Sequence, residues 1–141
     1  MERLGALGDG GKWVCGLSRV AQKPDCVVYS FGQYFNLISL TTHLMLSLTG
    51  INYESSFEME ILDNTEHCQI WGYDFSVTAF GPEIPRSLLH RTHFKAFGLS
   101  GEDKHDPEDN PPMYTLESLM KMNGKYFYFF FLFSSHSLIN N

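Results

Sequence analysis

Basic residues are scarce in this chain, and they are not clustered. Ten lysines and arginines stand against sixteen aspartates and glutamates among 141 residues, which leaves a net charge of −6. An acidic chain without a basic cluster repels phosphate backbones, so we expect no nucleic-acid partner. Charged residues make up only 18% of the chain and hydrophobic residues 43%, which supports a buried core rather than disorder. The length fits one domain.

Cysteine is also rare. Cys15, Cys26 and Cys68 form no CxxC pair, which argues against a zinc site of the usual spacing, and we expect no metal in this chain. An odd number of cysteines leaves at least one thiol unpaired in a monomer. A disulfide between Cys15 and Cys26 would form only in an oxidising compartment, and the sequence does not identify the cellular location. Otherwise we expect buried, unreactive thiols.

Long apolar runs that could address or anchor the chain are missing as well. Met1 is followed by a polar, glycine-rich segment, so we expect no signal peptide within these residues; an addressing segment would lie outside them. Residues 33–50 are rich in apolar residues, but they also contain too many polar ones for a segment that spans a bilayer. We therefore expect no membrane span in this chain.

Several ligand-binding motifs are incomplete. Residues 5–12 are rich in glycine, but Trp13 stands where a phosphate-binding loop needs serine or threonine. No GxGxxG lies between a strand and a helix, which argues against a dinucleotide-dependent oxidoreductase. His90 and His93 are one helical turn apart, and without further ligands we interpret them as surface histidines. The acidic residues 102–109 lack the glycine and terminal glutamate of a calcium loop.

Apolar strand patterns alternate with helical patterns along the chain. The expected strands are residues 26–31, 68–73 and 94–99. The expected helices are residues 56–62, a short segment within residues 82–93, and residues 114–122. We expect Ser55 or Ser56 to cap the first helix and Thr115 the last, with residues 5–16 as a flexible glycine loop and residues 102–112 as a solvated loop. This order predicts an α/β fold, a partial doubly wound (Rossmann-like) parallel sheet with the first strand in the middle.

Two stretches do not fit this alternation. Residues 33–50 interrupt the turn after the first strand without a clear period, and residues 125–141 open with a nearly continuous aromatic run. Both can be read as translated intron sequence, because the codons of residues 124–126 can contain a splice donor (GGT-AAG-TAT). We interpret residues 1–124 as a partial domain interrupted by residues 33–50, followed by a hydrophobic tail outside it. The alternative is a lineage-specific insertion and a tail that packs or anchors.

With residues 33–50 set aside, four motifs follow one another. They are residues 8–15 (GDGGKWVC), residues 28–32 rejoined to residues 51–58 (VYSFG and INYESSFE), residues 73–76 (YDFS) and residues 97–101 (FGLSG). In this order and spacing the chain resembles class I S-adenosylmethionine-dependent methyltransferases of the FkbM-related type. The resemblance implies the first half of a class I methyltransferase fold, with S-adenosylmethionine as cofactor and a methyl acceptor that the sequence does not identify.

The resemblance places the cofactor at the carboxyl ends of the strands. The turn after the first strand needs a glycine so that the backbone can approach the cofactor, and Gly32, or Gly50 after rejoining, supplies it. Asn52, Glu54 and Ser55 follow in the loop and would contact the methionine moiety, whose positive charges favour carboxylates and carbonyls.

The nucleoside contacts follow from the next two strands. The resemblance implies that Asp74, at the end of the second strand, accepts hydrogen bonds from both ribose hydroxyls. Without the resemblance, Asp74 would be read as capping the turn before Ser76. Phe75 would flank the adenine, and Leu99 with Ser100 would line its other side.

Catalytic residues stay unassigned. In the family, the helix matching residues 114–124 leads into a strand with an acidic motif, whereas this chain enters the aromatic run. We therefore expect a methyltransferase domain fragment with the cofactor-binding half present and the second half of the sheet missing, inactive as written. The alternative is a non-catalytic interaction protein or inert fragment with an exposed sheet edge and an aromatic tail.

Sequencing the transcript tests the intron interpretation. We expect a mature message that lacks the codons of residues 33–50 and departs from the present sequence near residue 125. A message that retains both segments would contradict the interpretation.

Overall fold

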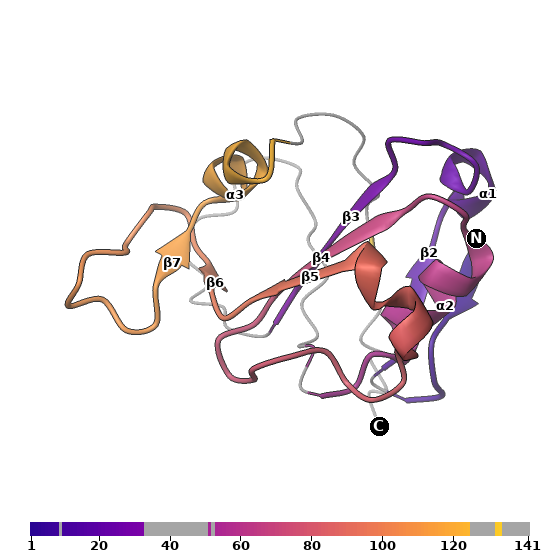
Figure 1. Cartoon of the computed structure of the whole chain (residues 1–141), viewed down its shortest axis with the longest axis horizontal. Helices are drawn as coiled ribbons and strands as arrows, with labels where there is room; N and C mark the ends of the chain where they lie inside the picture. The colour runs from indigo at the N-terminus through magenta and orange to yellow at the C-terminus, as the bar shows by residue number, and fades with distance from the viewer. Residues whose placement is uncertain (9, 33–50, 52, 125–131, 134–141) are drawn as a thin grey trace, which may run out of the picture.

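The structure is a computed structural model of the whole chain (Figure 1). It describes residues 1–8, 10–32, 51 and 53–124, together with the backbone of residues 132–133. Gly50, Asn52 and almost all of the expected insertion and tail lie outside the described residues.

A parallel sheet of three strands forms the centre of the molecule (Figure 1). Its strands are β3 (Val27–Phe31), β4 (Gln69–Tyr73) and β5 (Thr92–Lys95), all rich in β-branched or aromatic residues. Ser30 lies opposite Gly72, and Gly72 lies opposite Phe94. The parallel pairing confirms the expected partial doubly wound, Rossmann-like α/β fold.

The expected strand order is wrong in one respect. The order is β3-β4-β5, so β4 and not β3 lies in the middle. The reason is that β4 is hydrogen-bonded along both edges, whereas the other edge of β3 pairs with no strand in the described part of the chain.

Helix α2 (Ser56–Asn64) covers one face of the sheet and extends two residues beyond the expected end. Phe57, Ile61 and Leu62 recur at helical spacing and are buried against the strands. The main core cluster comprises Leu4, Val14, Leu17, Cys26, Val28, Phe57, Ile61, Leu62, Cys68, Ile70 and Ile84. Each large side chain of this kind contributes about 1.5–3 kcal/mol when fully buried.

Helix α3 (Leu116–Met122) lies on the opposite face of the sheet. Leu119 packs there against Phe31 and Tyr73. The expected cap is confirmed, because the Thr115 hydroxyl accepts a hydrogen bond from the Ser118 amide at 3.2 Å. Asp103 adds a second cap that the sequence did not suggest, since its carboxylate accepts hydrogen bonds from the Thr115 amide and the Ser118 hydroxyl.

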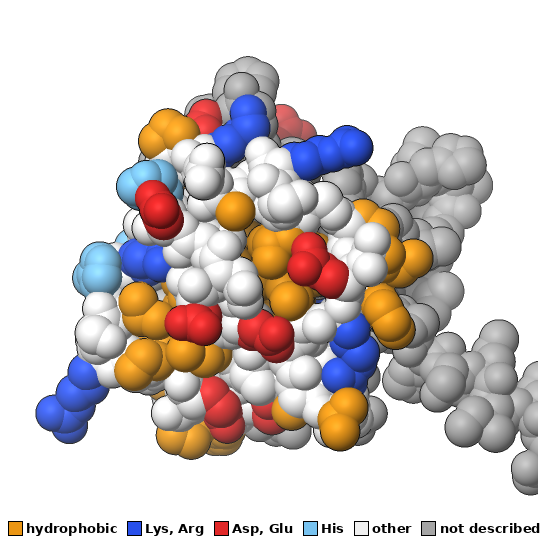
Figure 2. Space-filling model, turned by 90° about the vertical axis from the view of Figure 1, so that its right-hand side faces the viewer, with side chains coloured by type: hydrophobic (Ala, Val, Ile, Leu, Met, Phe, Trp, Pro, Cys, Tyr) orange, Lys and Arg blue, Asp and Glu red, His pale blue; other side chains and the backbone are white. Residues whose placement is uncertain are grey.

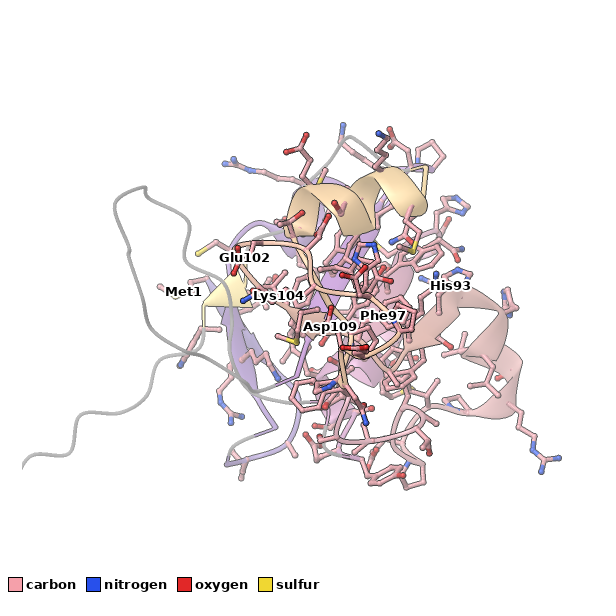
Figure 3. The ribbon with its side chains drawn as sticks, turned by 90° about the vertical axis from the view of Figure 1, so that its left-hand side faces the viewer. Met1, His93, Phe97, Glu102, Lys104 and Asp109 are labelled. Carbon is pink, nitrogen blue, oxygen red and sulfur yellow. A yellow bond between two sulfur atoms is a disulfide. The ribbon has the colours of Figure 1, made fainter. Side chains whose placement is uncertain are left out.

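The third expected strand is broken. β5 ends at Lys95, where the Phe97 amide donates to the Lys95 carbonyl across a tight three-residue turn. The following strand, β6 (Gly98–Leu99), pairs in parallel with β7 (Met113–Tyr114) instead of with β4. The segment between β6 and β7 is mostly exposed, as expected for a solvated loop, and its Glu102, Lys104 and Asp109 appear in Figure 3.

The short helix expected within residues 82–93 is the 3₁₀ helix η1 (Arg86–Arg91). Its last residue, Arg91, is buried, and burial lowers the pKa of its guanidinium. This group donates to the Leu62 carbonyl, the Thr65 hydroxyl and the Cys68 carbonyl. Arg91 therefore joins the end of α2 to the start of β4.

The glycine loop expected within residues 5–16 connects two strands, and Trp13 and Val14 of the apolar stretch at its end lie in the second strand. β1 (Glu2–Leu4) and β2 (Lys12–Val14) form an antiparallel hairpin, and α1 (Leu17–Val20) follows it. β8 (Leu132–Phe133), from the segment interpreted as a tail, pairs with the other edge of β2. No helix in the described part of the chain is long and apolar enough to cross a membrane.

The disulfide links Cys26 to Cys68, so the pairing considered for Cys15 is wrong. Each of the two cysteines directly precedes a strand of the parallel pair β3 and β4, which brings their Cα atoms to 4.4 Å. Cys15 is a free, exposed thiol rather than a buried one.

Reduction of the disulfide should lower the free energy of unfolding by about 4 kcal/mol, because a cross-link across 42 residues restricts the unfolded chain. Urea unfolding with and without reducing agent measures the change. The Cys15→Ala variant is the control, and it should unfold at the same urea concentration as the unmodified chain. An unchanged midpoint after reduction would contradict the linkage.

Candidate cofactor site at the strand ends

The ends of β3 and β4 meet at one edge of the sheet. The Gly32 amide donates to the Tyr73 carbonyl at 2.6 Å, which continues the ladder by one residue. A Cβ added to Gly32 would lie 2.2 Å from the Asp74 Cγ atom. Asp74 therefore faces the Gly32 turn, and only glycine allows this close approach.

Asp74 also closes the turn that leaves β4. Its Oδ1 atom accepts from the Ser76 amide at 2.8 Å and from the Ser76 hydroxyl at 2.6 Å. The carboxylate is thus held in one orientation, and only 3% of the residue is exposed. The turn-capping interpretation of Asp74 is observed directly, and it fixes the same carboxylate that the ribose interpretation requires.

The segment before α2 also lies near this edge of the sheet. Ile51 is buried, and its Cδ1 atom is 2.9 Å from the point where a Cβ on Gly72 would lie. The Glu54 amide donates to the Ile51 carbonyl at 2.6 Å, and the Glu54 Oε1 atom accepts from the Ser56 amide at 3.1 Å. The Glu54 side chain therefore caps the start of α2.

Ser55 takes the position expected of a helix cap but acts differently. Its hydroxyl accepts from the Gly81 amide at 2.8 Å, while its own amide donates to the Glu83 carboxylate at 3.0 Å. The two carboxylates Glu54 and Glu83, rather than a serine hydroxyl, satisfy the first amides of α2. Neither acidic cap was predicted from the sequence.

Two buried titratable side chains, Glu58 and Lys12, lie beneath this segment. The Ser30 hydroxyl donates to the Glu58 Oε1 atom at 2.6 Å, and the Oε2 atom of Glu58 is buried without a hydrogen-bond partner. Burial raises the pKa of Glu58, while the nearby Lys12 ammonium and the Ser30 hydrogen bond oppose that rise. Burial likewise lowers the pKa of Lys12, whose ammonium lies 4.8 Å from the centre of the Phe57 ring.

The sequence contains a signal for the burial of Glu58. Glu58 stands three and four residues before Ile61 and Leu62, so helical periodicity places it on the buried side of α2. No comparable pattern marks Lys12, because its burial comes from the hairpin.

Comparison with protein families decides the class of the chain. A family model described as methyltransferase domain matches residues 1–125. The chain belongs to the methyltransferase domain family. No curated protein and no solved structure matches it.

The remaining predicted site residues of the methyltransferase domain, Phe75, Leu99 and Ser100, lie at or beside β6. Phe75 follows Asp74, and its Cδ1 atom is 3.1 Å from the point where a Cβ on Gly98 would lie. Leu99 packs against the Phe31, Tyr73 and Leu119 cluster, and the Ser100 amide donates to the Tyr114 carbonyl at 2.9 Å. Leu99 and Ser100 were predicted to end the third strand of the main sheet. Instead, Leu99 belongs to β6 and Ser100 follows it.

The two histidines of the methyltransferase domain lie in different surroundings. His90 is exposed, as expected. His93 is half-buried instead of exposed; its ring stacks on Trp71 at 4.2 Å between centroids, and its Nε2 atom lies 2.9 Å from the Gln69 Oε1 atom. The described residues contain no group of three or more side chains placed to hold a metal ion.

The surface of the methyltransferase domain carries charges of both signs. On the face seen in Figure 2, acidic side chains separate most of the lysines and arginines, and apolar side chains lie between them. That face therefore presents no continuous basic patch.

Replacement of Glu58 by glutamine should flatten the pH dependence of stability. Because the pKa of Glu58 is raised in the folded chain, the folded chain holds a proton that the unfolded chain releases above its ordinary pKa of 4.5. Stability from this group is therefore present below pH 4.5 and is lost as the pH rises through the raised pKa. Urea unfolding at a series of pH values measures the slope in the Glu58→Gln variant.

The exposed Glu117 offers a matched control. The Glu117→Gln variant should keep the pH slope of the unmodified chain. An unchanged slope in the Glu58→Gln variant would contradict the burial of Glu58.

Proposed function

We propose that this methyltransferase domain binds S-adenosylmethionine at the carboxyl ends of β3 and β4. The close approach of the Gly32 backbone and the Asp74 carboxylate is the observation that supports the proposal. In open α/β sheets, ligands bind outside the carboxyl ends of the strands, where a glycine turn and an acidic residue recognise a nucleoside. Membership of the methyltransferase family supports a methyl donor of this class.

The residues at this edge fit the chemistry of the cofactor. Ribose hydroxyls are hydrogen-bond donors, and the carboxylate of Asp74 is an acceptor of the kind that they need. Phe75 offers an apolar ring beside the adenine. In the rejoined sequence, residues 51–58 follow the Gly32 turn and include Glu54. The carboxylate of Glu54 would attract the positively charged methionine end of the cofactor.

When bound, the cofactor supplies an electrophilic methyl group. The chain's own contribution is to hold the cofactor in place, because a positioned methyl group needs only an aligned nucleophile and exclusion of water. The resemblance implies an acidic motif after the helix at residues 114–124, and this sequence has an aromatic run there instead. We therefore assign cofactor binding to this chain, and not methyl transfer by the chain as written.

Titration of S-adenosylhomocysteine into the full chain tests the proposal. We expect binding by the unmodified chain and about 10- to 100-fold weaker binding by the Asp74→Asn variant, because hydrogen bonds to a charged acceptor contribute about 1.5–3 kcal/mol. Asparagine retains the oxygen that caps the Ser76 turn, so this variant loses the charge and not the turn. Calorimetry measures both affinities.

A Ser76→Ala variant is the matched control. It removes one hydrogen bond to Asp74 and leaves the carboxylate, so its affinity should stay within a few-fold of the unmodified chain. Failure of the folded, unmodified chain to bind the ligand would contradict the proposal and favour a non-catalytic interaction protein.

A further inference from the structure

The glycine-rich loop of the N-terminal hairpin packs against the first half of α2. The Ala6 amide donates to the Ser56 hydroxyl at 2.7 Å, and the Gly5 amide donates to the Glu60 carboxylate. A Cβ on Gly5 would lie 3.1 Å from the Phe57 Cα atom. In Figure 1 the hairpin strand β2 and α2 lie at the same end of the molecule.

One arginine fixes the shape of this loop. The Arg3 guanidinium donates to the carbonyls of Gly5, Ala6 and Gly8 at 3.3, 2.8 and 3.1 Å. A Cβ on Gly11 would lie 2.3 Å from the same guanidinium. The loop is therefore stabilised by hydrogen bonds from Arg3 to its carbonyls and by hydrogen bonds from its amides to α2.

Gly10 presses against the Glu54 carboxylate. A Cβ on Gly10 would lie 2.0 Å from Oε2, 2.4 Å from Cδ and 2.7 Å from Oε1 of Glu54. All three separations are too short for a real contact, so a side chain at this position would displace the carboxylate. The three atoms nearest to the Cβ position of Gly10 all belong to the Glu54 side chain, so this side chain is the first obstacle to alanine there.

Displacement of Glu54 would alter the start of α2. The Glu54 carboxylate accepts a hydrogen bond from the Ser56 amide. The Lys12 ammonium interacts electrostatically with Glu54 and donates to the Gly10 carbonyl at 3.5 Å. The hairpin thus confines Glu54 on one side, and the helix start confines it on the other.

We propose that Gly10 is a positioning residue for the methyl-donor site: by lacking a side chain, it lets the hairpin hold the Glu54 carboxylate at the start of α2. The inference rests on the proposed function, in which Glu54 attracts the positive end of the cofactor. It assigns the N-terminal hairpin a role in binding as well as in folding.

The Gly10→Ala variant tests this role by two measurements. The first is affinity for S-adenosylhomocysteine, which we expect to fall at least tenfold. Shortening the acid in the double variant Gly10→Ala, Glu54→Asp should restore most of the loss, which a merely structural defect would not show. Gly101→Ala is the matched control, because nothing lies within 4 Å of the Cβ position of Gly101 and its φ is outside the left-handed region.

The second measurement needs no ligand. The Ser56 amide resonance reports its hydrogen bond to Glu54, so Gly10→Ala should move it toward its position in Glu54→Ala, and Gly101→Ala should not. An unmoved resonance, an unchanged affinity or a failed rescue by Glu54→Asp would each overturn the inference. If the unmodified chain binds no ligand while the resonance moves as expected, the proposed function fails and the contact between Gly10 and Glu54 stands.

Discussion

The parallel pairing of β3 with β4 is the interaction on which the rest of the structure depends. At one end of this pair the disulfide joins Cys26 to Cys68, and at the other end Gly32 continues the ladder to Tyr73. The register between these ends brings Asp74 against Gly32. A shift of one residue would turn every side chain of β3 to the opposite face and would separate the cysteines as well as the proposed cofactor site.

Two faces of this sheet are filled in different ways. The face beneath α2 is mainly aliphatic, but it also contains the buried titratable side chains Glu58 and Lys12. The face beneath α3 is aromatic, with Tyr29, Phe31 and Tyr73 stacked in sequence. Burial raises the pKa of Tyr73 to about 12 despite the hydrogen bond from the Asn123 amide, so this hydroxyl stays neutral.

Local patterns in the sequence predicted the strands and helices of the parallel sheet well. Apolar, β-branched runs marked β3 and β4, helical spacing marked α2, and Thr115 marked the start of α3. The position of Asp74 against Gly32 was also predictable, because the carboxyl ends of parallel strands meet at the same edge.

Most of the remaining errors share a physical cause, since they depend on contacts between residues far apart in sequence; the cap from Glu54 to the Ser56 amide is local and is the exception. The break after Lys95 follows from pairing of β6 with β7, and the hairpin is stabilised by α2. The disulfide partner of Cys26 is set by strand register, which residue spacing alone does not encode. Capping by Glu83 likewise requires the loop on which it lies to fold back onto the start of α2.

Arg91 has a consequence for how the domain opens. Its single guanidinium holds the end of α2, the connection at Thr65 and the entrance of β4. Local fluctuations usually release the weakest segment of a protein first, but release of any of these three would leave a buried cation without its acceptors. Opening of the stretch from Leu62 to Cys68 therefore requires loss of the Arg91 hydrogen bonds to Leu62, Thr65 and Cys68.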